Sequence, residues 1–377
     1  MSKKILFLTG TRADFGKMHP LMNKVEVSDQ FDCHVFITGM HMLSKYGSTY
    51  KEVEKKGYKN IYKYINQTDD NKMDIILSNT ILGLSNYVQE LKPDLIVVHG
   101  DRVEALAGAI VGALNNILVA HVEGGEISGT IDELMRHSIT KLAHLHLVAN
   151  EEAKNRVIQL GEKKENVFII GSPDIDIMMN EDLPTLDEAK SRYELDFDNY
   201  AILLYHPVTT KLDSLSQNVE ELIDAIVESK KNYIVVYPNN DEGSNIIINQ
   251  YKKLYNKDNF KLFPSIRFEY FLTLLRNASF IIGNSSAGVR EAEIYGIPSI
   301  NIGTRQNKRN NSDNIINVEH KRKEILKVIN EVKDLSFEPE FKFGEGKSSE
   351  KFFEIISNNK IWNISAQKTF VDINNFY

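Results

Sequence analysis

The amino-acid sequence predicts an α/β protein made of two successive units, each with a doubly wound parallel sheet. Three observations lead to this prediction. Short apolar, β-branched runs alternate with helical segments along the chain, which is the pattern of right-handed strand–helix–strand crossovers. The alternation is interrupted after residue 171 and begins again at residue 201. The length of 377 residues also exceeds what one hydrophobic core usually covers.

In the first unit, each predicted strand is a short apolar run that ends in polar or glycine residues, which mark the turn into the next helix. The predicted strands cover residues 4–8, 33–37, 95–98, 117–120, 145–149 and 167–170. The predicted helices are one that ends near residue 26, residues 73–91, 104–113 and 151–160, and one that opens at residues 130–133. The polar residues 51–72 show neither pattern.

The second unit repeats this pattern after a connection at residues 171–200, which contains two prolines, many charges and one short helix predicted near residues 186–193. The predicted strands cover residues 201–205, 233–237, 260–263, 280–282 and 299–302, and a predicted helix covers residues 218–229. We therefore expect a first domain at residues 1–180 and a second at residues 181–354. The amphipathic tail, residues 355–377, is expected to pack back onto the first domain.

The composition excludes several classes of protein. Hydrophobic residues make up 42% of the chain and charged residues 26%, as in ordinary globular proteins. The 52 acidic and 45 basic residues give a net charge of −7, which argues against nucleic-acid binding. A lone cysteine, Cys33, allows neither an internal disulfide nor a thiolate metal site. With no signal-peptide or membrane-spanning run, we expect a cytoplasmic protein that does not contact membranes.

Acidic residues follow two consecutive predicted strands of the first unit. Asp101 comes soon after one strand and Glu123 soon after the next, each preceded by a histidine and flanked by glycine. Ligands of parallel sheets bind beyond the carboxyl ends of the strands, so both acids are expected at one edge of the sheet. The following helix opens with Asp132 and Glu133. For those two, a capping box with Thr130 and the helix dipole offer equally good structural explanations.

Basic and hydroxyl side chains follow other strand ends. Arg12 and Lys17 lie where a strand-to-helix turn can meet an anion, although solvated surface charge is the more common explanation for two such bases. Ser285 and Ser286 are expected to cap a helix whose free amides and dipole would form an anion site. Glu291 would lie later on that helix, where a carboxylate can accept two ribose hydroxyls. The alternative is an ordinary serine-capped helix with a surface glutamate.

Several long motifs, in order along nearly the whole chain, resemble the UDP-N-acetylglucosamine 2-epimerase family. The motifs are GTRADFGK at 10–17, HGDR at 99–102, HVEGGEISGTIDE at 121–133, RHSITKLAH at 136–144, HPVTT at 206–210, FPSIRFEYF at 263–271, GNSSAGVREA at 283–292 and GTRQ at 303–306. The resemblance implies a glycosyltransferase-B-like fold. In that fold two Rossmann-like domains enclose a cleft, and a C-terminal helix crosses back to the first domain.

The resemblance also implies roles for individual residues. Four residues fall on the catalytic positions of the family: Asp101, Glu123, Asp132 and His206. Seven fall on positions that contact UDP: Arg12, Arg102, Asn239, Ser285, Ser286, Glu291 and Arg305. Further candidates are Lys17, Glu133 and Arg267, with Glu133 standing where relatives carry aspartate. No metal or other cofactor is expected, and the partners implied are a UDP-sugar substrate and further copies of the chain in a homodimer or higher homo-oligomer.

Two motifs resemble the hydrolysing branch of the family: HVEGGE at 121–126 and HPVTT at 206–210. The reaction implied converts UDP-N-acetylglucosamine and water to UDP and N-acetylmannosamine, the first step toward sialic acid. Loss of UDP would give an oxocarbenium-like centre, and removal of the carbon 2 proton would then give 2-acetamidoglucal, which is hydrated. One acid and one base are needed, and the sequence does not decide which carboxylate is which.

Other functions remain open at this point. The same reaction on UDP-N,N'-diacetylbacillosamine would differ only in the sugar pocket, and a non-hydrolysing epimerase would keep the bond between UDP and the sugar. A transferase of the same fold would need an acceptor, and a nucleotide-sugar sensor would not need the acids at 101, 123 and 132.

Overall fold

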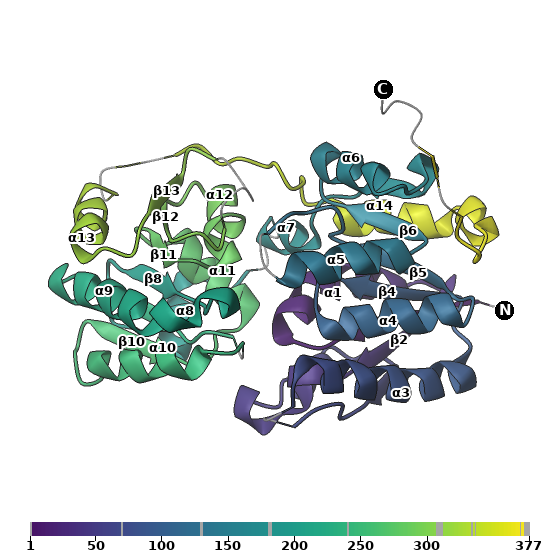
Figure 1. Cartoon of the computed structure of the whole chain (residues 1–377), viewed down its shortest axis with the longest axis horizontal. Coiled ribbons are helices and arrows are strands. Elements are labelled where there is room, and N and C mark those ends of the chain that lie inside the picture. The colour runs from purple at the N-terminus through teal and green to yellow at the C-terminus, as the bar shows by residue number, and fades with distance from the viewer. Residues whose placement is uncertain are drawn as a thin grey trace. The chain divides into compact units, whose positions relative to one another are not determined.

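A computed structural model describes residues 2–68, 71–128, 131–179, 183–239, 241–306, 312–332, 335, 337–369 and 371–372 (Figure 1). The chain divides into two compact units. The first comprises Met1–Glu126, Ile131–Met179 and Lys342–Tyr377, and the second comprises Ile127–Thr130 and Asn180–Phe341. Each unit contains a parallel sheet with helices, which confirms the α/β fold that the sequence predicts.

The first unit contains a seven-stranded parallel sheet with strand order β3-β2-β1-β4-β5-β6-β7. Its strands are β1 Lys3–Thr9, β2 Phe31–Ile37, β3 Asn60–Lys63, β4 Leu95–His99, β5 Leu118–Val122, β6 Leu145–Val148 and β7 Val167–Ile169. Its helices are α1 Arg12–Glu26, α2 Tyr50–Lys55, α3 Met73–Leu91, α4 Val103–Leu114, α5 Ile131–Leu142, α6 Glu151–Gln159, α7 Pro173–Met178 and α14 Ser348–Ser357. The order reverses direction at β1 and β4, the arrangement in which doubly wound sheets bind ligands at the carboxyl ends of their strands.

The second unit contains a six-stranded parallel sheet with strand order β10-β9-β8-β11-β12-β13. Its strands are β8 Ala201–Leu204, β9 Tyr233–Val236, β10 Phe260–Phe263, β11 Ile281–Gly283, β12 Ser299–Ile302 and β13 Ile315–Val318. Its helices are α8 Leu186–Arg192, α9 Leu215–Glu228, α10 Ser244–Tyr251, α11 Phe268–Arg276, α12 Glu291–Ile294 and α13 Arg322–Glu331. None of the helices in the described part of the chain is long and apolar enough to cross a membrane.

Several local features differ from the sequence prediction, among them the last strand, β13, which was not predicted. Residues 51–72, which show no pattern in the sequence, contain α2 and the edge strand β3. The connection at 171–200 contains α7 in addition to the predicted short helix. The helix expected after β11 is instead a three-residue 3₁₀ turn, η6 Ser286–Gly288, followed by the four-residue α12. The backbone of Arg290, at φ −123° and ψ −65°, interrupts the helical conformation between these two pieces.

The C-terminal segment returns to the first unit, as the family resemblance implies. Phe352 and Ile356 of α14 are buried in the core that includes β1 and α1. The carboxylate of Asp176 in α7 accepts hydrogen bonds from the amides of Ser348 and Ser349, at 2.8 and 2.7 Å. These bonds satisfy two of the free amides at the start of α14.

The residues beyond α14 are anchored by part of the RHSITKLAH motif. Nε2 of His144 donates to the carbonyl of Ala366 at 3.0 Å, while its Nδ1 accepts from a backbone amide of β5. Lys368 lies 2.6 Å from a carboxylate oxygen of Glu162, which also contacts His146. Burial alone would raise the pKa of Glu162, but these partners lower it to about 2. This motif therefore has a structural role in addition to any role in catalysis.

Candidate functional site

Glu123 follows β5 directly and has an unusual backbone conformation. Its φ is +64°, in the left-handed region that residues with a Cβ seldom adopt. Its amide donates to the Leu147 carbonyl of β6 at 3.0 Å, which fixes this conformation beside the sheet. The residue is only 5% exposed. Backbone strain and a buried carboxylate at a strand end are typical of functional sites.

Three side chains from different elements surround the Glu123 carboxylate. Lys17 of α1 places Nζ 3.8 Å from Oε1, and the Ser172 hydroxyl donates a hydrogen bond to the same oxygen. His99, the last residue of β4, places Nε2 3.3 Å from Oε2. A cation and a hydroxyl donor both favour the ionised carboxylate. The structure thus brings Lys17, a further candidate from the sequence, next to a predicted catalytic acid.

Asp174 also belongs to this cluster, although the sequence interpretation placed it in a connection between domains. Its Oδ2 lies 3.0 Å from Nζ of Lys17, and its side chain is 1% exposed. The preceding Ser172 caps the same short helix, α7. The sequence Ser-Pro-Asp resembles a linker turn, but a serine followed by proline at the first helical position is equally a helix start. That signal would have identified α7.

Asp101, after β4, forms an ion pair with Arg136 of α5. The Arg136 side chain is 2% exposed, and its Nη1 donates to the carbonyl of Glu126 at 3.0 Å. A buried guanidinium needs a carboxylate partner, because an unpaired charge in the interior is very costly. Arg136 therefore fixes both Asp101 and the backbone after Glu123. In the sequence this arginine belongs to the RHSITKLAH motif, but nothing there links it to the site.

Asp132 and Glu133 occupy the first turn of α5 and are both half-buried. Glu133 Oε1 lies 3.5 Å from Nε2 of His137, one turn further along the helix. The capping box proposed for Glu133 involves Thr130, which lies outside the described residues. Asp132 is one helical turn from Arg136, and its negative charge acts on that guanidinium.

The predicted UDP-binding arginines of the first unit form ion pairs at the carboxyl end of the same sheet. Arg12, the first residue of α1, makes a two-pronged contact with Glu52, with Nε 2.8 Å from Oε2. Arg102 directly precedes α4 and places Nε 3.3 Å from Oε2 of Glu104. Paired guanidinium groups are held in defined positions, because two parallel hydrogen bonds fix the plane of the group.

In the second unit, Asn284 connects the ends of β8 and β11. Its Oδ1 accepts from the His206 amide at 2.7 Å, and its Nδ2 donates to the His206 carbonyl at 2.8 Å. Its own carbonyl accepts from Arg305 Nη1 at 3.1 Å and from Gln306 Nε2 at 3.0 Å. Asn284 therefore brings two predicted site residues together. The sequence interpretation missed it, although its place between a strand and two serines is a usable signal.

A glycine allows Asn284 to approach the backbone at the end of β8 closely. Gly283, the last residue of β11, has φ +142°, and a Cβ there would lie 2.0 Å from the carbonyl oxygen of Leu204 in β8. Any larger residue would push β11 away from β8. Without the glycine, Asn284 could not reach the backbone of His206.

His206 is held as a neutral imidazole. Its Nδ1 accepts a hydrogen bond from the amide of Asn239 at 3.1 Å, so the ring proton is on Nε2. Burial, together with the positive charge of Arg305, lowers the pKa of His206 to about 3. The side-chain amide of Asn239 in turn donates to Asp241 at 2.6 Å. The predicted residues His206, Asn239 and Arg305 therefore form one connected group.

The two predicted serines and Glu291 lie on the interrupted helical segment after β11. The Ser285 hydroxyl accepts from the Ala287 amide at 3.3 Å and caps η6, which begins at Ser286. Glu291 is the first residue of α12 and is buried. Because neither piece has more than four residues, the helix dipole expected here is much smaller than that of a full helix. Arg267 caps α11, where its amide donates to the Tyr193 hydroxyl at 3.0 Å.

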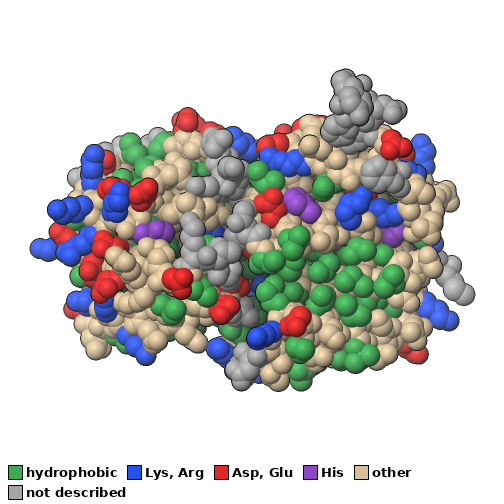
Figure 2. All heavy atoms as spheres, in the orientation of Figure 1, with side chains coloured by type: hydrophobic (Ala, Val, Ile, Leu, Met, Phe, Trp, Pro, Cys, Tyr) green, Lys and Arg blue, Asp and Glu red, His purple; other side chains and the backbone are tan. Residues whose placement is uncertain are grey.

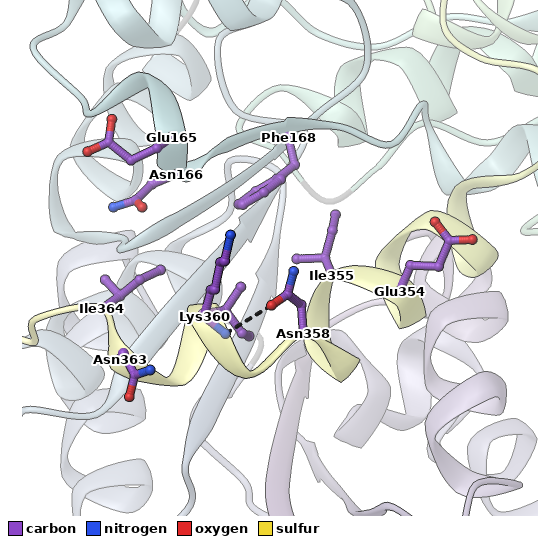
Figure 3. A pocket seen from close by; sticks show the side chains of 10 residues that line it. Glu165, Asn166, Phe168, Glu354, Ile355, Asn358, Lys360, Asn363 and Ile364 are labelled. Carbon is purple, nitrogen blue, oxygen red and sulfur yellow. Dashed lines mark hydrogen bonds between the residues drawn. The ribbon is translucent and has the colours of Figure 1, made fainter.

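Two cavities lie near these sheets. One of about 320 Å³ adjoins Asn284 in the second unit and is also lined by Tyr205, Thr304 and His320. The Tyr205 hydroxyl and His320 Nε2 are 2.7 Å apart there. The other, of about 480 Å³, lies between the amino end of β7 and the C-terminal segment (Figure 3). None of the predicted site residues lines the second cavity, so we do not assign the chemistry to it.

Comparison with known proteins identifies the family. The model of the UDP-N-acetylglucosamine 2-epimerase family matches residues 23–357. The chain belongs to this family. It is 48% identical over 376 residues to a UDP-N-acetylglucosamine 2-epimerase of Neisseria meningitidis serogroup B, covering 99% of this chain and 100% of the relative. It is 33% identical to a hydrolysing UDP-N,N'-diacetylbacillosamine 2-epimerase of Legionella pneumophila, covering 94% and 96% of the two chains.

The fold of the family is also found among solved structures. The chain resembles the crystal structure of UDP-GlcNAc 2-epimerase from Neisseria meningitidis bound to UDP-GlcNAc, with a TM-score of 0.81. The similarity covers 94% of this chain and 100% of that chain at 19% sequence identity. Seven of the eight motifs that carry the family resemblance begin at or next to the ends of β1, β4, β5, β8, β10, β11 and β12, whereas RHSITKLAH begins within α5. These seven therefore start at the carboxyl ends of the strands, where parallel sheets bind ligands.

Proposed function

We propose that the protein is a hydrolysing UDP-N-acetylglucosamine 2-epimerase that releases UDP and N-acetylmannosamine and so begins sialic acid synthesis. The observation that carries the proposal is the pair of acids after β4 and β5. Glu123 is buried on a strained backbone and contacts Lys17, while Asp101 is paired with buried Arg136. Nucleotide binding alone would not need two such carboxylates. The names of the Neisseria and Legionella relatives support an epimerase, and the second supports hydrolysis.

UDP departure is the first step of the proposed reaction. Charge develops on the leaving diphosphate, and Arg305 and the amides near Ser285 and Ser286 would stabilise it. His206 is neutral, with its proton on Nε2, so it would donate a hydrogen bond to an oxygen without adding a full charge. Glu291 would accept the ribose hydroxyls. We thus assign UDP mainly to the second unit.

Proton transfer at carbon 2 is the second step. Once UDP has left, the carbon 2 proton is acidic, and a carboxylate of the first unit would remove it to give 2-acetamidoglucal. A second carboxylic acid would then protonate carbon 2 while water adds to carbon 1. Glu123, Asp101 and Asp132 are the groups proposed for these transfers. Efficient transfer requires groups whose proton affinities differ, and these acids do lie among different partners.

The alternative sugar is UDP-N,N'-diacetylbacillosamine, on which the Legionella relative acts according to its name. The higher identity to the Neisseria relative favours the N-acetylglucosamine derivative. A non-hydrolysing epimerase is the other alternative within the family. It would share the carbon 2 chemistry but would retain the bond between UDP and the sugar.

Isotope labelling separates these functions. In heavy water, the released N-acetylmannosamine should carry deuterium at carbon 2. In oxygen-18 water, the label should enter the anomeric position and not UDP, when product is read by NMR before anomeric exchange. A simple hydrolase would give N-acetylglucosamine without deuterium, and a non-hydrolysing epimerase would give deuterated UDP-sugar. N-acetylmannosamine without deuterium at carbon 2 would exclude the elimination route.

We also propose that the protein is a homodimer, joined through an apolar face of the first unit. Apolar side chains gather over α4 and α5, with α3 beside them (Figure 2). The large apolar residues on these helices that are 44% to 78% exposed are Met73, Ile75, Leu82, Leu114, Ile131 and Leu134. Soluble monomers seldom expose apolar patches of more than several hundred Å².

A second copy of the chain is the partner that fits this face. From Ala105 to Leu114, α4 carries no charged residue, so this part of the face presents no charge for a partner to complement. A neutral apolar face is complementary to itself in a two-fold contact. Light scattering should give twice the 43.1 kDa chain mass. Leu114→Glu should give monomers, whereas Val27→Glu, at a 72% exposed residue outside this face, should not. A monomeric wild-type protein would exclude the dimer.

A further inference from the structure

We propose that Asp174 is a positioning residue, which holds Lys17 at a set distance from Glu123. This inference rests on the proposed function. Asp174 belongs to none of the sequence motifs that resemble the family. Its carboxylate is 3.0 Å from Nζ of Lys17, which is within hydrogen-bonding range. The same Nζ is 3.8 Å from Glu123, which is beyond that range.

The ammonium group of Lys17 thus lies at two different distances from two carboxylates. Lys17 makes a close ion pair with Asp174 and a longer one with Glu123. At 3.8 Å the ammonium forms an ion pair with Glu123 that is too long for a hydrogen bond, and its charge still favours the ionised form. Lysine has a long flexible side chain, so without Asp174 its ammonium would close on Glu123 and compete for the same oxygen.

Stability alone does not explain this ion pair. The Asp174 side chain is 1% exposed and that of Lys17 is 14% exposed. Moving two charges out of water costs about as much as, or more than, their attraction returns, so apolar residues of similar size would be at least as stable. In some proteins, buried polar and ionic groups are retained because they define a geometry. Here the ion pair between Lys17 and Asp174 defines the position of Lys17 beside Glu123, which lies on the strained turn after β5.

The helix that carries Asp174 is itself well fixed. Ser172, the residue before α7, donates its hydroxyl to Glu123. Its amide donates to the Phe343 carbonyl of the returning chain, at 2.6 Å. Asp176, two residues after Asp174, binds the start of α14. Two supports of Glu123 therefore come from one helix, and the C-terminal segment holds that helix in place.

The test compares Asp174→Asn with Asp176→Asn, a change of the same kind on the same helix. Asp174→Asn should lower kcat by about 10- to 100-fold, the usual effect of losing a residue that orients a ligand or catalytic group. KM and the Kd of UDP should stay within about twofold. Asp176→Asn should lower the unfolding temperature but leave kcat near the wild-type value.

The pH profile adds a measurement that a purely structural residue would not change. The charged and titratable groups around Glu123 are Lys17, His99, Asp174 and Arg136. Removing the negative charge of Asp174 leaves the positive charge of Lys17 less compensated, which favours ionised Glu123. The acid limb of the kcat profile should therefore move to lower pH in Asp174→Asn and remain in place in Asp176→Asn.

Two further measurements keep the outcome clear. If Asp174→Asn folds poorly because Lys17 loses its partner, the Lys17→Met/Asp174→Asn double variant should fold but remain slow, and recovery of wild-type turnover would overturn the inference. A crystal structure of Asp174→Asn should show Nζ of Lys17 within hydrogen-bonding distance of Glu123, and an unchanged 3.8 Å separation would also overturn it. The two proposals can fail separately. A wild-type protein inactive on UDP-sugars would reject the proposed function, whereas the distance between Lys17 and Glu123 is measured in a crystal and does not depend on turnover.

Discussion

The carboxyl ends of the two sheets are built from different kinds of interaction. In the first unit, buried ion pairs position the acids, as Arg136 does for Asp101 and Lys17 does for Glu123. In the second unit, Asn284 positions the backbone of His206 through neutral hydrogen bonds, and the imidazole is itself neutral. Charged pairs suit proton transfer, because each partner changes the proton affinity of the other. A neutral network suits ligand positioning, because it fixes geometry without attracting competing ions.

The largest effect should come from the acids of the first unit. Glu123→Gln, Asp101→Asn and Asp132→Asn should each lower kcat by about 10²- to 10⁴-fold, the usual contribution of an acid or base. The Kd of UDP, measured by calorimetry, should change less than twofold. If all three variants kept near wild-type turnover, proton transfer would not take place at the charged end of the first sheet. The comparison between the two sheets would then fail.

The next largest effect should come from Asn284→Ala in the second unit. The change leaves the amide and the carbonyl of His206 without their partners, at a cost of roughly 1–3 kcal/mol for each buried group. Both the free energy of unfolding and the affinity for UDP should fall. Asn284→Asp keeps the acceptor but loses the donor, so it should have an intermediate effect. Loss of turnover with unchanged UDP affinity would contradict the proposal that the second sheet binds UDP and the first carries out proton transfer.

Glu291→Ala tests the ribose contact more narrowly. Loss of charged hydrogen bonds should weaken UDP binding by roughly 1–3 kcal/mol, about 5- to 150-fold in Kd. Glu242→Ala, at an exposed acid of the same unit, should have no effect on binding. Unchanged calorimetric affinity in Glu291→Ala would place the ribose elsewhere.

The last prediction concerns a feature that the two units share, a neutral histidine. His121 of β5 donates through Nε2 to the Gly100 carbonyl at 2.7 Å, and burial lowers its pKa to about 3. The unfolded chain takes up this proton below about pH 6.5, so the free energy of unfolding should fall by about 1.4 kcal/mol for each pH unit from 6.5 toward 3. Urea unfolding of His121→Asn between pH 5 and 6.5 should show a slope smaller by that amount. An unchanged slope would contradict a neutral His121.

Much of the fold was predictable because buried parallel strands leave continuous apolar runs in the sequence. The edge strand β3 was missed because only one side of it packs on the protein and its residues are polar or partly exposed. The segment after β11 was predicted as one helix because its composition allows one. The backbone of Arg290 that divides it depends on tertiary packing, to which a single sequence gives no access.

The candidate site was predictable where a residue lies at a strand end, as with Asp101, Glu123 and His206. Its supporting residues were not. Arg136 reaches Asp101 from 35 positions away, and arginine is rarely buried, so its type suggests a surface position. Asp174 was interpreted as part of a linker because a Ser-Pro-Asp sequence is common in turns. Partners of this kind are determined by the packing of α5 and α7 against the sheet.

The return of α14 to the first unit has a consequence for synthesis of the protein. The second unit, apart from Ile127–Thr130, is one continuous stretch from Asn180 to Phe341, so it can fold once that stretch has left the ribosome. The first unit requires Lys342–Tyr377 as well, and Phe352 is buried in its core. The unit that is made first is therefore completed last. Until then, the apolar surface on α1 that α14 covers is exposed to solvent.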